Sequence, residues 1–118
     1  MEVRIRISAP DRPAEYAALW NWLRTERELA GRTRAIQRPP GPEELGDGID
    51  LIALAVSSLS VLIALAQTIP GYLSTRRSQI RLHLRRADGA ELELDSDTDI
   101  DKVASLVQVF LRDGFDDE

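Results

Sequence analysis

The feature that most constrains the fold of this chain is a long stretch without charge, LIALAVSSLSVLIALAQTIPGYLST, which covers residues 51–75. Its length overlaps the about 17 to 25 residues that a membrane-spanning helix requires, and Arg76 and Arg77 follow as a basic flank would. Serines, a glutamine and a proline interrupt the run, however. They leave residues 51–66 as its strongly apolar part, which is nearer to the length of a buried helix.

We therefore expect a long apolar helix over residues 49–69, which Pro70 kinks or ends near Ile69 because proline removes a backbone donor. Small or polar residues recur along this helix at steps of four and three, and such a stripe lets a neighbouring helix or a second subunit approach closely. One small sheet covers only one side of a helix that is apolar nearly all round. The sequence thus favours an interface in a soluble assembly, while membrane insertion and burial within the chain's own fold stay open. The expected interface residues are Ala53, Ser57, Ser60, Ala64, Gln67, Arg76 and Arg77.

The stretch QIRLHLRRADGAELELDS predicts a β-hairpin, because leucines alternate with charged residues on both arms. A two-residue turn would put leucine and carboxylate on the same face, which a core does not tolerate. A three-residue loop over residues 87–89, with Gly89 in the left-handed conformation, avoids this conflict. That register pairs Leu84 with Leu92 and Leu82 with Leu94 on the dry face. On the wet face it pairs Arg85 with Glu91, His83 with Glu93 and Arg81 with Asp95.

The remaining periodicities complete an α+β fold of order β-α-β-α-β-β-α. VRIRI and, more weakly, TRAIQ predict strands, and residues 13–30 predict a helix with Trp20 in the core stripe and Trp22 partly exposed. The Pro/Gly-rich residues 39–48 predict a loop. TDIDKVASLVQVFLRDG predicts an amphipathic closing helix, capped by Thr98 or Asp99 and ended by Gly114. A mostly antiparallel, four-stranded sheet with one wet face and helices on the other satisfies this order.

Composition limits the possible functions. The length of 118 residues suits a single domain over residues 1–118, with residues 39–48 as an internal loop. The absence of cysteine excludes disulfides, thiol catalysis and thiolate metal sites. The net charge of -5 argues against nucleic acid as a partner, since such binding rewards a basic surface. The start MEVRIRISAP lacks the apolar core of a signal peptide, so we expect a cytoplasmic protein.

No set of residues in the sequence completes a catalytic or metal site. His83 is the only histidine, and on a strand's outer face beside a carboxylate it is more typical of a surface pair. The alternating aspartates of DSDTDID lack the glycine and the final glutamate of a calcium loop. We therefore expect no catalytic residues, no cofactor, no metal and no enzymatic activity.

At this point the order of features resembles the effector-associated constant component family of actinobacterial conflict systems. An uncharged apolar helix runs into TRRSQIRLHLRRADGAELELDSDTD, and the likeness is carried by Arg76, Arg77, Asp88 and Gly89 with the surrounding alternation. It covers most of the chain and is best over residues 50–110. The resemblance implies a noncatalytic component encoded beside variable effectors, such as caspase-like or trypsin-like peptidases, in bacterial conflict and immunity systems.

We accordingly expect an adaptor or regulatory interaction module that forms a homo-oligomer or docks an effector through the helix over residues 49–69. The alternative is a membrane-inserting component that uses the same helix as a transmembrane segment. A small-ligand sensor or enzyme subunit comes last, for want of convergent polar groups.

Overall fold

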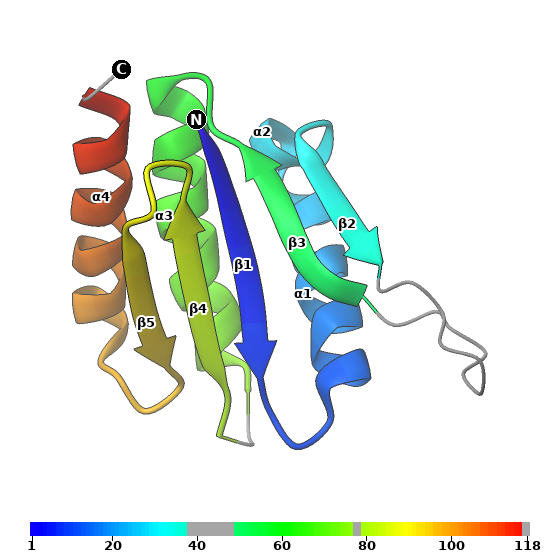
Figure 1. Ribbon diagram of the computed structural model, residues 1–118. Coiled ribbons are helices and arrows are strands. Elements are labelled where there is room, and N and C mark those ends of the chain that lie inside the picture. The colour runs from blue at the N-terminus through cyan, green and yellow to red at the C-terminus, as the bar shows by residue number, and fades with distance from the viewer. Residues whose placement is uncertain (38–48, 77–78, 117–118) are drawn as a thin grey trace.

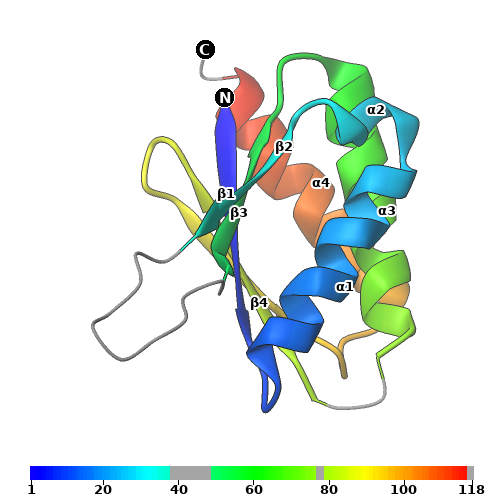
Figure 2. The same cartoon turned by 90° about the vertical axis from the view of Figure 1, so that its right-hand side faces the viewer.

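The computed structural model describes residues 1–37, 49–76 and 79–116. Within them the chain forms an antiparallel sheet of five strands in the order β2-β3-β1-β4-β5. All the helices lie on one side of the sheet, and the other side is open (Figure 1, Figure 2). The α+β class, the antiparallel sheet and the single helix-covered face are confirmed, although four strands were expected. In chain order the elements are β1 (Glu2–Ser8), α1 (Arg12–Thr25), α2 (Arg27–Ala30), β2 (Thr33–Gln37), β3 (Ile49–Ala55), α3 (Leu59–Ser74), β4 (Arg81–Arg86), β5 (Glu91–Asp95) and α4 (Ile100–Asp116).

The first strand, β1, is the centre of the sheet and pairs with β3 on one side and with β4 on the other. Its apolar residues Val3, Ile5 and Ile7 are at most 3% exposed, whereas Arg4 and Arg6 between them are exposed. The strict alternation that predicted this strand therefore also separates the two faces of the sheet. The weaker prediction of a strand over TRAIQ is confirmed as β2, at the far edge.

The apolar stretch holds a strand followed by a helix, so the prediction of one helix over residues 49–69 is wrong. Ile49–Ala55 form β3, and Ser58 then begins α3 by accepting a hydrogen bond from the Val61 amide at 3.4 Å. Residues 51–54 are all buried: Ile52 and Leu54 face the core, and on the other face Ala53 lies between Arg4 and Arg34. A strand buried on both faces has a continuous apolar sequence, and periodicity alone does not distinguish it from a buried helix.

Pro70 was expected to kink or end the helix near Ile69. It does not end α3, which continues to Ser74. The turn that follows Pro70 carries Tyr72 and Leu73, which are 1% and 4% exposed. Burying each such side chain stabilises the fold by about 1.5 to 3 kcal/mol, which offsets the roughly 3 kcal/mol that an internal proline costs. None of the helices in the described part of the chain is long and apolar enough to cross a membrane.

The helix α3 is largely covered within the chain's own fold. It lies behind the sheet with α4 on one side and α1 and α2 on the other (Figure 2). The Trp22 indole of α1 donates to the Thr68 carbonyl at 3.1 Å, and a Cβ added at Gly71 would lie 3.2 Å from the Trp22 ring. Glycine at this position therefore allows the ring to pack directly on α3, and Trp22, as predicted, stays partly exposed, at 37%.

The predicted helix over residues 13–30 is two helices in the structure. Glu26 takes an extended backbone conformation, with φ -85° and ψ 121°, and separates α1 from the short α2. Leu23 and Leu29 on either side of this break are both fully buried, so the change of direction lets both helices contact one core.

The hairpin of β4 and β5 has the predicted register at all five pairs, from Arg81 opposite Asp95 to Arg85 opposite Glu91. The loop also has the predicted length, since the Arg86 amide donates to the Ala90 carbonyl at 2.9 Å. Gly89 has a φ of +94°, the left-handed conformation that glycine adopts without steric cost. The predicted register, loop length and Gly89 conformation are therefore confirmed.

The closing helix α4 begins as predicted, because the Asp99 carboxylate accepts a hydrogen bond from the Asp101 amide at 2.8 Å. It does not end at Gly114, however, and continues to Asp116. A Cβ at Gly114 would lie only 2.6 Å from both the Arg86 and Met1 side chains. The glycine therefore serves close packing inside the helix rather than ending it.

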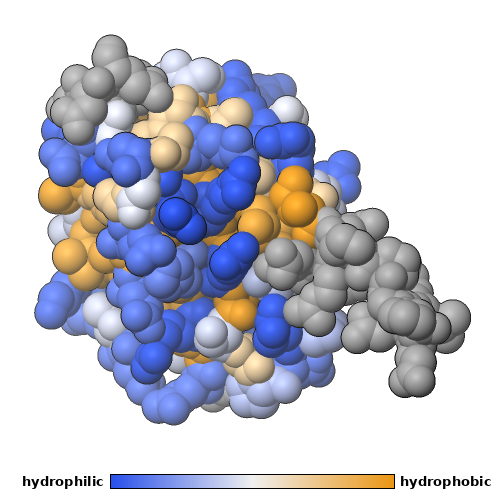
Figure 3. Space-filling model, in the orientation of Figure 1, coloured by the Kyte–Doolittle hydropathy of each residue, from blue (hydrophilic) through white to orange (hydrophobic). Residues whose placement is uncertain are grey.

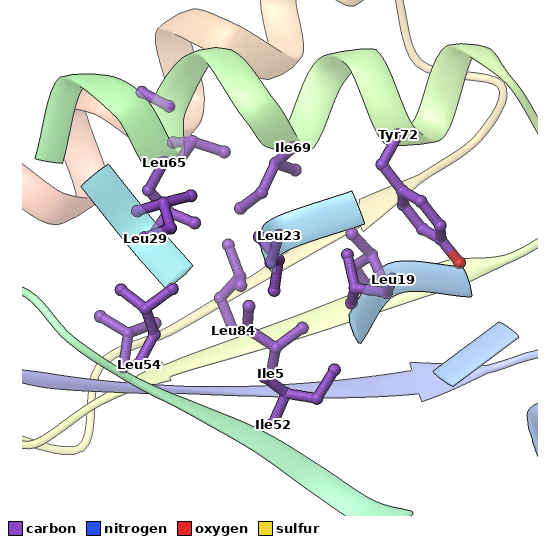
Figure 4. Packing of buried hydrophobic residues seen from close by; sticks show 14 of the residues in the cluster. Ile5, Leu19, Leu23, Leu29, Ile52, Leu54, Leu65, Ile69, Tyr72 and Leu84 are labelled. Atoms are coloured by element: carbon purple, nitrogen blue, oxygen red, sulfur yellow. The ribbon is translucent and has the colours of Figure 1, made fainter. Parts of the chain in front are cut away.

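The core fills the space between the sheet and the helices. Apolar side chains from β1, β3 and β4 meet those of α1, α2 and α3 in one cluster, which Figure 4 shows from close by. The labelled members are Ile5, Leu19, Leu23, Leu29, Ile52, Leu54, Leu65, Ile69, Tyr72 and Leu84. Because all of the helices pack on this side, the opposite face of the sheet carries no covering element in the described part of the chain.

Candidate docking face

Arginines from two neighbouring strands meet on the open face of the sheet. In the β1–β4 pair, Arg4 lies directly opposite Arg85 and Arg6 lies directly opposite His83. We call these four residues the basic quartet. Like charges placed directly opposite one another on a sheet destabilise it. The fold therefore maintains a concentration of positive charge here, although the chain has a net charge of -5.

The acidic residues of the face neutralise this charge only in part. The pairs across the hairpin are diagonal, since Arg81 binds Glu93 at 2.9 Å and His83 lies 3.3 Å from Glu91. The directly opposite pairing of the sequence analysis is therefore correct for the backbone register, while the side chains of Arg81 and His83 contact the acidic residue two positions before the opposite one. This shift leaves Glu91 beside His83, and Arg85 has no ion pair with the described residues.

The other strand has a similar imbalance. A single carboxylate, Glu2, lies 3.4 Å from Arg4 and 3.5 Å from Arg34. Arg6, in the middle of β1, has no carboxylate within ion-pair distance among residues 1–37, 49–76 and 79–116. Two exposed guanidinium groups, those of Arg6 and Arg85, are thus available on adjacent strands.

The basic quartet lines a hollow with a volume of about 410 Å³. Glu2 and Glu91 also line it, together with Arg86 and Ala87 at the start of the hairpin loop. Figure 3 shows the face that contains it, with hydrophilic side chains across the middle of the sheet and a hydrophobic area over β3. Exposed arginines around a hollow suit the binding of carboxylates, because the planar guanidinium can donate two parallel hydrogen bonds to one.

A second polar cluster is buried between α1 and the end of α3. The Tyr72 hydroxyl donates to the Glu15 carboxylate at 2.7 Å, and Arg76 contacts the same carboxylate oxygen at 3.1 Å. Burial, followed by the hydrogen bond and the negative charge of Glu15, raises the pKa of Tyr72 well above its ordinary value. The Arg76 guanidinium also lies over the Tyr72 ring, 5.1 Å from its centroid. Through these contacts Arg76 holds the end of α3 against α1.

A third cluster holds the hairpin loop against α4. Arg86 is 7% exposed and makes two hydrogen bonds to Asp88, at 3.1 and 2.7 Å, and one to the Phe110 carbonyl at 2.7 Å. The hydrogen bonds from Arg86 lower the pKa of Asp88 below its usual value. Asp88 and Gly89, which carry the family resemblance, therefore shape the loop. In the described residues no group of three or more histidine, cysteine, aspartate or glutamate side chains is placed to hold a metal ion.

The residues predicted to form an interface do not lie on one surface. Ala53 is on β3, on the open face between Arg4 and Arg34, and only 1% exposed. The others described lie on the helix side of the sheet or at its end: Ser57, Ser60 and Gln67 are exposed, Ala64 is 9% exposed, and Arg76 belongs to the buried cluster. Arg77 lies outside the described residues. No single helix joins these positions, because the stretch divides into β3 and α3.

The sequence predicts that each arginine of the basic quartet lies on the wet face of its strand, but not that the two strands pair. Both strands alternate arginine with apolar residues, which places Arg4, Arg6 and Arg85 on wet faces. The pairing of β1 with β4 brings them together, and no local pattern specifies that pairing. The missed signal for β3 was the alternation of large Ile52 and Leu54 with small Ala53 and Ala55, which is a strand period.

The fold and this face define a class of protein: a small antiparallel sheet backed by helices, whose open side carries a charged, hollowed surface. A family model described as Effector Associated Constant Component 1 matches residues 8–111, and the chain belongs to this family. The description makes the chain a component associated with effectors. The match includes His83 and Arg85 and begins after Arg4 and Arg6. No curated protein and no solved structure matches the chain.

Proposed function

We propose that this chain is a cytoplasmic, noncatalytic adaptor of a bacterial conflict system, and that it docks an effector protein on the open face of the sheet. The observation that carries the proposal is the pair of exposed guanidinium groups, Arg6 and Arg85, which have no acidic partner in the described residues. None of the helices among the described residues covers this face of the sheet (Figure 2). An effector with complementary charge would relieve the repulsion between the opposed arginines, and such complementarity steers and orients association.

The partner that the family resemblance suggests is a peptidase-type effector, caspase-like or trypsin-like, encoded beside this chain. The family description supports association with an effector and names no reaction for this component. In this proposal the effector carries the chemistry, and the docking face sets its position.

A site-specific photocrosslinking experiment tests the location of the interface. One variant carries a photoreactive residue at Ser8, which is exposed on the open face opposite Arg81; its matched control carries the same residue at Gln67, exposed on α3. After co-expression with the neighbouring effector, we expect a crosslinked product from position 8 and none from position 67. Crosslinking from position 67 alone would contradict the proposal.

A second candidate function, self-association through α3, has its own supporting observation. Leu59 and Ile63 are 47% and 39% exposed on this helix, and the exposed Ser60 and Gln67 lie on the same helix. Packing of these side chains against a second copy would bury apolar surface. Absolute mass from light scattering, compared between the wild type and Ile63→Glu, tests it: an oligomer that the substitution dissociates supports this function, and a wild-type monomer excludes it.

A further inference from the structure

We infer that the ligand of the open face is an extended, acidic segment of the partner protein, an inference that rests on the docking role proposed above. The geometry of the basic side chains is the first argument. On one face of a strand, side chains repeat every about 6.8 Å. Arg4 and Arg6 on β1, and Arg81, His83 and Arg85 on β4, have this repeat. A partner segment in extended conformation, with acidic residues at alternate positions, presents carboxylates at the same spacing.

The hairpin itself contains a comparable pairing of alternate acidic residues with alternate basic ones. On β5, Glu91 and Glu93 alternate with leucine, and they contact His83 and Arg81 on the neighbouring strand. These contacts occupy the β5 side of β4 only. On the β1 side, Arg6 and Arg85 are diagonal neighbours. Arg6 lies opposite His83, and Arg85 is the next residue of β4 on the same face. A second acidic segment lying over these two strands would supply the carboxylates that they lack.

The rim of the hollow favours a short acidic peptide over nucleic acid. Glu2 and Glu91 line the same hollow as the basic quartet, and Glu93 and Asp95 continue a negative row along β5. A polyphosphate chain carries a charge at every residue and would meet these carboxylates, whereas counterion release rewards an uninterrupted basic surface. A peptide can place its carboxylates over the arginines and uncharged residues over the rim.

The size and composition of the site agree with this ligand. A volume of about 410 Å³ is large enough for a few side chains and too small for a folded element. The hydrophobic area beside it (Figure 3) would contact the apolar residues of the same segment, and on the edge strand β2 Ile36 is 37% exposed. The guanidinium groups stay charged at any physiological pH, so binding depends on the ligand's carboxylates.

The test uses a peptide that alternates glutamate and serine over about ten residues, or about 33 Å when extended. The peptide is titrated into the full, isotope-labelled chain, and binding is measured by NMR from the shifts of the backbone amide signals of β1 and β4. Its twin, with glutamine in place of glutamate, controls for charge. We expect saturable shifts from the glutamate peptide only, lost at about 1 M salt, where the screening length falls to about 3 Å.

Variants of the chain then locate the binding. Arg6→Glu/Arg85→Glu is expected to weaken binding by about tenfold or more. Arg27→Glu/Arg112→Glu, which changes the charge equally at two exposed helix positions, is expected to bind like the wild type. Arg6→Gln/Arg85→Gln removes the two positive charges without adding carboxylates, so it separates loss of attraction from new repulsion. Both substitutions at positions 6 and 85 are expected to leave the amide spectrum of a folded chain, because the positions are exposed.

Three results would overturn the inference: equal binding of the glutamine peptide, tighter binding of a single-stranded RNA of similar length, or an increase in mass showing that the occupant is a second copy. If the effector crosslinks at position 8 but the glutamate peptide does not bind, the acidic ligand is wrong and the docking role stands. If the effector crosslinks only at position 67, the docking role itself fails, and the inference fails with it.

Discussion

The buried contact between Tyr72 and Glu15 gives a prediction about what joins α1 to the end of α3. In Tyr72→Phe the ring stays and only the hydroxyl is lost, which donates to the Glu15 carboxylate at 2.7 Å in a site where Tyr72 is 1% exposed. A hydrogen bond to a charged group contributes about 1.5 to 3 kcal/mol. Arg76 continues to neutralise Glu15 in the variant, so we expect the lower part of this range, about 1.5 to 2 kcal/mol.

The assay is urea denaturation of the wild type, Tyr72→Phe, Glu15→Ala and the double variant; alanine leaves no side-chain acceptor at position 15. A domain of this size loses roughly 3 to 6 °C in Tm for each kcal/mol, so thermal unfolding provides a second measurement. Because the two side chains share one hydrogen bond, we expect a coupling free energy of about 1 kcal/mol or more in the cycle. Glu28→Gln on α2 is the control and should be within about 0.5 kcal/mol of the wild type. Strict additivity of the two substitutions would refute the assigned contact.

The same contact determines a dependence on alkaline pH. The pKa of Tyr72 in the folded protein is raised above its value of about 10 in an unfolded chain. Its contribution to stability is therefore fully present below about pH 10 and is lost as the pH rises above that value. The wild type should lose stability relative to Tyr72→Phe over this alkaline window, and parallel curves would contradict the assignment.

Two further predictions concern the hairpin loop. Gly89→Ala places a side chain at a φ of +94°, so we expect it to lower the free energy of unfolding by about 1 to 2 kcal/mol, measured by urea denaturation; an unchanged midpoint would show that the loop takes another conformation. In Asp88→Asn the melting temperature should fall less between neutral and acid pH than in the wild type, because Arg86 lowers the pKa of Asp88 in the folded state. The contribution of the carboxylate to stability is present above about pH 4 and is lost as the pH falls. Equal losses of melting temperature between neutral and acid pH in the two proteins would disprove this role.

The hairpin was predictable because its information is local. The alternation on each arm, the charge signs and the DG turn all lie within QIRLHLRRADGAELELDS, and only one register satisfied the leucines. The structure has that register and the left-handed Gly89. The backbone register does not specify the side-chain contacts. Arg81 and His83 contact Glu93 and Glu91 diagonally, which leaves Arg85 without an acidic partner among the described residues.

The strand β3 was not predicted because burial on both faces removes the alternation of polar with apolar residues, and only the weaker alternation of large with small side chains remains. Leu51 and Ala53 are buried on the open face and Ile52 and Leu54 in the core, so the sequence is apolar throughout. The same error placed the expected interface on a helix that does not exist in one piece. The basic quartet depends on β1 pairing with β4. Five elements, from α1 to α3, separate these two strands in the sequence, and a long-range pairing is set by the whole sheet rather than by either strand.

The measurement that tests the docking claim most directly is the affinity of this chain for the effector proposed as its partner, measured for three proteins. These are the wild type, Arg6→Glu/Arg85→Glu on the open face and Arg27→Glu/Arg112→Glu on the helices. We predict that the open-face variant loses about tenfold or more in affinity, mostly at low salt, and that the helix variant binds like the wild type. Equal affinities for all three proteins, or a loss confined to the helix variant, would contradict it.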